Sequence, residues 1–223
     1  MAVALLVVAN LLNNRWARWA YVPTSLVTAA LLLGVLRLAG LAWSDAGLGR
    51  AEAARGARWA LVLVALVAAG CFVGALIPAT RRVFLDRRAE QVGIGSAAYQ
   101  VLVRIPLGTV VLEEVAFRGV LYGLLRPDGI AWATAVSSLL FGLWHLLPAR
   151  ELPKLNPTID RMFDARPPLV VAAVVIATAL AGVVLCELRR RSGSLLAPIG
   201  VHWAFNALGF ATAAVVTRWR RRT

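Results

Sequence analysis

Two adjacent glutamates, Glu113 and Glu114, lie in the middle of an apolar stretch that runs from residue 99 to residue 125. An ionisable side chain at bilayer depth costs several kcal/mol, so each is a candidate for function. Glu114 and Arg118 are four residues apart, so they share one helix face and can form an ion pair. Glu113 points about 100° away from that face. It needs water, a proton or a partner from another helix. A structural ion pair therefore explains Glu114 and Arg118 but not Glu113.

Both histidines of the chain also lie in apolar stretches. His145 follows Phe141 by one helical turn and Asn206 follows His202 by one turn, so each pair lies on a common face. A single buried histidine is commonly a satisfied core residue, but two of them beside a glutamate pair on a third helix favour a functional site. A carboxylate can activate water as a general base. The Asn206 amide and a ring N–H of His202 can donate hydrogen bonds to a developing oxyanion.

The elements that must position these residues are membrane helices. Of the 223 residues, 60% are hydrophobic and 16% charged, whereas soluble domains have about 45–50% and about 25%. We expect an all-α, polytopic transmembrane bundle of about six to eight helices. Pro106 and Gly108 lie one to two turns before the glutamates and predict a bent or opened turn. The segment 2–12 either spans the membrane or lies in the interface. The predicted spans are 22–41, 59–79, 99–125, 130–147, 168–188 and 195–217.

The chain divides into N-terminal spans and connectors (1–98), a core that holds the polar residues (99–217) and a basic tail (218–223). The Pro-Asp-Gly sequence after Arg126 predicts a tight turn, so the spans on either side of it form an antiparallel hairpin. Residues 148–167 are expected to form the longest polar loop.

The net charge of +13 comes almost entirely from arginines, since Lys154 is the only lysine. The arginines cluster between the apolar stretches, where they anchor helices and favour anionic lipid. We therefore expect membrane lipid as a partner and no nucleic acid. Cys71 and Cys186 are isolated within apolar stretches, so they offer neither a disulfide framework nor metal-ligand spacing. The Arg-rich and Ala-rich composition indicates a high-GC bacterium, and we expect a multi-pass protein of the bacterial inner membrane.

Three strings occur in order on three apolar helices, and together they resemble the motifs of the CPBP family. These are intramembrane proteases related to type II CAAX prenyl endopeptidases and to bacteriocin-processing proteins. The resemblance covers about residues 100–210 and includes the sequences from Phe117 to Gly123 and from Leu196 to Asn206. The three strings are Glu113-Glu114-x-x-x-Arg118, Phe141-x-x-x-His145 and His202-x-x-x-Asn206.

The resemblance implies an endopeptidase that cleaves peptides or membrane-anchored proteins within the membrane. It assigns Glu113 as the general base and His145 as a partner that positions the water. It assigns His202 and Asn206 to binding of the oxyanion. The remaining motif residues support the site: Glu114, Arg118 and Phe141.

Three alternatives stay open. We expect no cofactor, but Glu113, His145 and His202 would also form a catalytic zinc ligand set with water as the fourth ligand. The helix signature His-Glu-x-x-His, which would arrange such a set, is absent from the sequence. A non-catalytic immunity or partner protein would retain the polar core without using Glu113. An ion-coupled transporter would relay protons through Glu and His, but the polar residues here are confined to one half of the chain.

Overall fold

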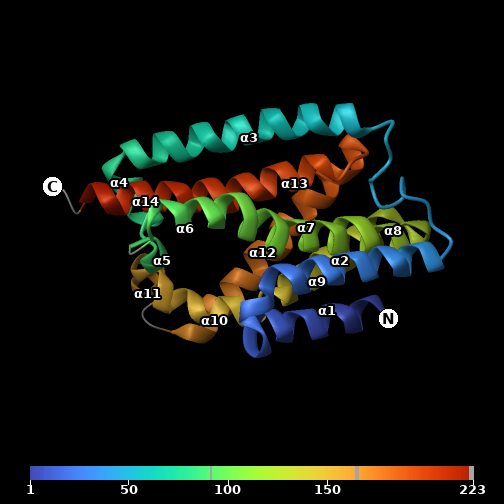
Figure 1. Cartoon of the computed structure of the whole chain (residues 1–223), viewed down its shortest axis with the longest axis horizontal. Coiled ribbons are helices and arrows are strands. Elements are labelled where there is room, and N and C mark those ends of the chain that lie inside the picture. Colours follow the sequence, from blue (N-terminus) through green and yellow to red (C-terminus); the bar gives the residue numbers. More distant parts are fainter. Residues whose placement is uncertain (91, 164–165, 221–223) are drawn as a thin grey trace.

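The computed structural model describes residues 1–90, 92–163 and 166–220, and this part of the chain is all helical with no strand (Figure 1). The predicted all-α membrane bundle is confirmed. Within the described residues, five helical segments are long and apolar enough to cross a membrane. They are Arg18–Leu38, Ala53–Leu76, Ile94–Asp128, Pro167–Ser192 and Leu196–Trp219.

A sixth segment consists of two helices that meet at a bend of 47°. These are α9 (Ile130–Trp144) and α10 (Leu146–Leu155). His145 is the residue between them. The first helix, α1 (Ala2–Leu11), has ten residues, which is too short to cross about 30 Å of hydrocarbon.

The other elements follow in chain order. They are a π-helix Leu12–Trp16, a 3-10 turn Arg18–Ala20, α2 (Tyr21–Leu38), α3 (Ala53–Leu76), α4 (Pro78–Arg81), a 3-10 turn Arg82–Phe84, α5 (Arg87–Glu90), α6 (Ile94–Tyr99), a π-helix Gln100–Val110, α7 (Val111–Glu113), a π-helix Glu114–Leu121, α8 (Tyr122–Leu125), a 3-10 turn Arg126–Asp128, α11 (Pro157–Met162), α12 (Pro167–Ser192), α13 (Leu196–Trp203), a π-helix Ala204–Leu208 and α14 (Gly209–Arg220).

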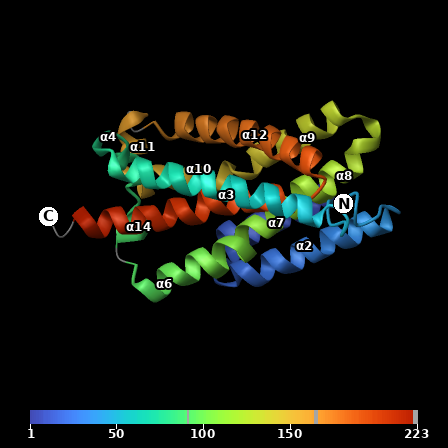
Figure 2. The same cartoon turned by 90° about the horizontal axis from the view of Figure 1, so that it is seen from above.

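The long helices lie roughly side by side (Figures 1 and 2). The segment α6–α8, which carries the glutamate pair, packs against α2 on one side and against the α13–α14 segment on another. Helix α3 covers α13, and α12 packs along α9 and α10. The glutamate pair is therefore surrounded by helices from both halves of the sequence.

Glycines allow α9 and α12 to pack closely. A methyl group added at Gly142 of α9 would lie 2.7 Å from the carbonyl oxygen of Val175, and one added at Gly182 of α12 would lie 3.0 Å from Ser138. Small residues at such crossings let two membrane helices approach through their backbones. This contact fixes the position of the C-terminal end of α9, next to His145.

The helix that carries the glutamates is opened into wide turns on both sides of α7. Pro106 lies inside the first π-helical stretch, as expected for a residue that has no backbone N–H to donate. In the second stretch, the Ser137 hydroxyl donates a hydrogen bond of 2.6 Å to the carbonyl oxygen of Phe117. Wide turns of this kind re-aim side chains and occur frequently at functional sites.

Two expectations about connections have different outcomes. The turn after Arg126 is confirmed, because the 3-10 turn Arg126–Asp128 is followed by Gly129 with φ +125°, and α9 begins at the next residue. The polar loop expected at 148–167 is wrong in its described part. Helices α10 and α11 occupy most of it, and the Asn156 side chain caps α11 by accepting hydrogen bonds from the next helical N–H groups at 2.9 and 3.2 Å. Residues 164–165 lie outside the described residues.

Candidate active site

Glu113 is the residue on which the cluster converges. It is 4% exposed, and its Oε1 accepts a hydrogen bond of 3.0 Å from the indole N–H of Trp144. Its Oε2 lies 3.7 Å from Nε2 of His202 and 4.0 Å from Nε2 of His145. This oxygen is buried and has no hydrogen-bond partner among the described residues. Glu113 therefore has one hydrogen-bond partner, on α9, and the two histidine rings from α13 and the bend after α9 lie close to its unpaired oxygen.

Glu114 and Arg118 form the ion pair that their spacing predicts. Both side chains are fully buried, and Oε2 of Glu114 lies 3.4 Å from Nε of Arg118. The Arg118 guanidinium lies over the ring of Phe141, 3.9 Å from its centroid. Within the bundle this stack is a desolvated cation–π contact, which is stronger than an exposed one. Phe141 therefore supports the ion pair, and its ring also meets His145 edge-on at 4.7 Å.

The hydrogen bonds of the two histidines fix which ring nitrogen carries hydrogen. Nδ1 of His202 lies 2.6 Å from Oε1 of Glu114, and Nδ1 of His145 lies 2.8 Å from the carbonyl oxygen of Phe141. A carboxylate or carbonyl oxygen only accepts, so both rings donate from Nδ1. A neutral ring then presents an Nε2 lone pair towards Glu113, whose Oε2 is also an acceptor. Three acceptors that face one another need a partner between them, such as a water molecule, an added proton or a cation.

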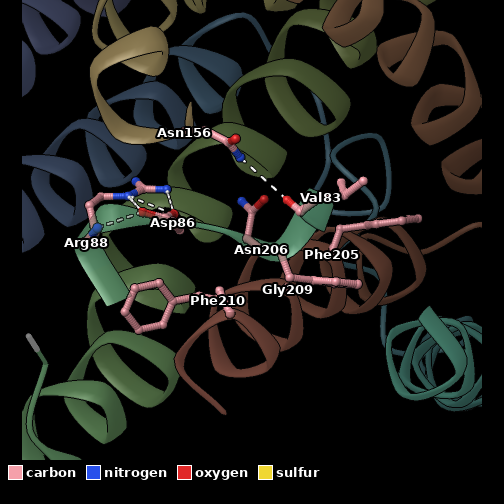
Figure 3. Close-up of a pocket in the computed structure, with 10 residues that line it drawn as sticks. Val83, Asp86, Arg88, Asn156, Phe205, Asn206, Gly209 and Phe210 are labelled. Carbon is pink, nitrogen blue, oxygen red and sulfur yellow. Dashed lines mark hydrogen bonds and ion pairs between the residues drawn. The ribbon is translucent and has the colours of Figure 1, made fainter. Parts of the chain in front are cut away.

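Asn206 lies apart from this cluster. A π-helical turn, Ala204–Leu208, begins two residues after His202 and changes the spacing of side chains along the helix. The exposed Asn206 side chain points into a cavity of about 260 Å³, towards Asn156 and Val83 (Figure 3). No hydrogen bond joins it to the glutamates or histidines among the described residues. The structure thus brings together six of the seven predicted residues and places Asn206 at the wall of a neighbouring cavity.

Trp144 is a site residue that the sequence did not single out. Tryptophans near the ends of spans are usually interfacial anchors. The sequence does not distinguish them from a tryptophan whose N–H points into the bundle. Its carbonyl oxygen accepts a hydrogen bond of 2.9 Å from the Asn10 side chain of α1. The one available signal was its position directly before His145, on the helix that the motif already marks.

Within the ranges that the structure describes, no set of three or more His, Cys, Asp or Glu side chains could hold a metal ion. The zinc alternative stays a prediction, and no step of the proposed reaction is assigned to a metal.

Several apolar membrane-length helices define an integral membrane protein, and a cluster of Glu and His side chains lies inside its bundle. A family model described as type II CAAX prenyl endopeptidase Rce1-like matches residues 95–208, about half of the chain. The chain belongs to this family. No curated protein and no solved structure matches it. The matched range contains every motif residue, from Glu113 to Asn206.

Proposed function

We propose that the protein hydrolyses peptide bonds of membrane-associated protein or peptide substrates, with Glu113 as general base. The single observation that supports this best is Oε2 of Glu113, which is buried, has no hydrogen-bond partner, and lies between two histidine Nε2 atoms at 3.7 and 4.0 Å. These distances are too long for direct hydrogen bonds. They suit one water molecule that donates to Glu113 and is positioned by His145.

The proposed reaction has two steps. Glu113 takes a proton from the water while the water oxygen bonds to the scissile carbonyl carbon. This step gives a tetrahedral oxyanion. The C–N bond then breaks, and the proton held by Glu113 moves to the leaving amine. This use of one carboxylate as base and then acid is ordinary general acid–base catalysis.

His202 is proposed to stabilise the oxyanion as an imidazolium. Two carboxylates and one guanidinium leave the cluster with one net negative charge, which is costly in low dielectric. A proton on His202 neutralises it, and Glu114 at 2.6 Å stabilises that cation. Nε2 of His202 then becomes a donor aimed towards the reacting centre. Arg118 and Phe141 act through Glu114, as positioning residues.

Asn206 is proposed to contact the substrate next to the scissile bond. The cavity that it borders has apolar walls from Phe205 and Phe210 (Figure 3). Both residues follow His202 along the chain. An extended peptide in this cavity would pass Asn206 before it reaches His202. Its amide would then donate to the oxyanion or to the adjacent peptide carbonyl. A leader peptide or a membrane-anchored protein fits such a site.

The test is cleavage of a library of membrane peptides by purified protein in detergent, with and without a chelator. Wild type is compared with Glu113→Gln and with Glu151→Gln, a matched change at an exposed glutamate of α10. We expect cleavage by wild type and Glu151→Gln, with and without chelator, and none by Glu113→Gln. Loss of wild-type activity with chelator would support the zinc variant. Equal cleavage by wild type and Glu113→Gln would refute Glu113 as the base.

A further inference from the structure

A second cavity lies at the other end of the bundle, where three connections meet. These are the 39–52 connector, the turn after α8 and the turn after α12 (Figure 1). The cavity has a volume of about 460 Å³. Five membrane-length segments begin or end here, at Leu38, Ala53, Asp128, Ser192 and Leu196. Its position along the spans is therefore that of the lipid headgroups.

The walls of this cavity carry more positive than negative charge. Four guanidinium groups and two carboxylates line it, which leaves an excess of two positive charges. Glu187, which is not a wall residue, forms an ion pair with the guanidinium of Arg190. The six charged wall residues are Arg55, Arg126, Arg189, Arg190, Asp45 and Glu52.

Two buried donors in these walls have no acceptor among the described residues. Arg189 is 4% exposed, and its Nη2 donates to the carbonyl oxygens of Ser44 and Asp45 at 3.1 Å each, but its Nε has no hydrogen bond. Tyr122 is 2% exposed, and its hydroxyl also has no partner. A buried polar group without a partner is costly, and its persistence in a fold points to an unseen partner.

We propose that this cavity binds a phosphate group, supplied by an anionic phospholipid headgroup. A phosphate offers several strong acceptor oxygens and negative charge, which match a cluster of guanidinium and hydroxyl donors. The acyl chains would run along the apolar helices below the cavity. The exposed side chain of Arg126 has no hydrogen bond or ion pair among the described residues, so its guanidinium is free to close over the ligand.

A ligand in this cavity would also fix the position of the α6–α8 segment, which carries Glu113. Arg189 binds the connector through Ser44 and Asp45, and the connector lies against the helix at Gly119 and Gly123. A methyl group added at either glycine would lie 3.4 or 3.1 Å from a connector carbonyl oxygen. A phosphate bound to Arg189 and Tyr122 would therefore link the connector to the helix that carries Glu113.

The test is binding of phosphatidylglycerol to the purified protein in detergent, titrated by native mass spectrometry. Diacylglycerol with the same acyl chains serves as the phosphate-free probe. Three variants are compared with wild type: Arg126→Gln, Tyr122→Phe and Arg161→Gln. The last makes the same charge change at an exposed position of α11, away from the cavity. No cleavage assay is involved, so the result is independent of the proposed protease function.

We expect phosphatidylglycerol to bind wild type and Arg161→Gln more tightly than diacylglycerol does. Arg126→Gln and Tyr122→Phe should each bind it about tenfold more weakly, the effect of one lost charge-assisted hydrogen bond. Displacement by millimolar inorganic phosphate would identify a site for phosphate groups in general, and resistance to displacement would assign it to the lipid. Equal binding by all four proteins, or equal binding of diacylglycerol, would overturn the proposal.

Discussion

Replacing Trp144 by Phe tests whether the proposed base is held by a single indole hydrogen bond. The substitution keeps an aromatic ring beside Phe117, whose centroid is 5.9 Å away. It removes the N–H that donates to Oε1 of Glu113 at 3.0 Å, together with the second ring of the indole. That oxygen has no other hydrogen-bond donor among the described residues. A hydrogen bond to a charged group contributes about 1.5–3 kcal/mol. If the bond is needed to orient Glu113 in the transition state, its loss lowers kcat by about tenfold to a hundredfold.

The assay is steady-state cleavage of a peptide selected from the library, with wild type, Trp144→Phe and Trp132→Phe compared. Trp132 is on the same helix and is 55% exposed, so its replacement controls for loss of an indole. We expect a lower kcat with little change in KM for Trp144→Phe alone, at an unfolding temperature within a few degrees of wild type. A kcat equal to that of wild type would refute the idea that this bond positions the base.

Three further substitutions concern stability, measured by thermal unfolding in detergent. Glu114→Gln leaves the Arg118 guanidinium buried without its counter-charge, and we expect a loss of about 3 kcal/mol or more. Phe141→Leu removes the ring 3.9 Å from Arg118, and we expect a loss of about 2 kcal/mol. Gly142→Ala places a methyl group 2.7 Å from a carbonyl oxygen of α12, and we expect a loss of about 1–3 kcal/mol.

For each of these substitutions, one result would contradict the reasoning behind the expected loss of stability. Gly70→Ala is the control for Gly142→Ala, because no atom lies within 4 Å of its added methyl group, and it should be neutral or slightly stabilising. Equal unfolding temperatures for the two glycine variants would mean that α9 and α12 are not closely packed. Unchanged stability of Glu114→Gln or Phe141→Leu would mean that the guanidinium finds water or another acceptor.

The sequence alone determined the membrane fold and the identity of most residues in the cluster. Apolar stretches of membrane length predict helices because a bilayer leaves no other way to pair backbone groups. Within those stretches, a charged side chain is so costly that each of the few ionisable residues is a candidate for a functional role. Glu114 and Arg118 were paired from their spacing alone, because a helix fixes the neighbours of a residue within one turn.

The tertiary structure decided the local pitch of the helices and which side chains from different helices lie together. The wide turns around Glu113 and after His202 are variations in helix pitch, and in a regular helix Asn206 would have been aligned with His202. Trp144 is part of the site because the packing of α9 brings its indole N–H to Oε1 of Glu113. The basic cavity at the opposite end joins residues from five separate segments. No local rule of spacing brings such segments together, because their proximity depends on how the whole bundle packs.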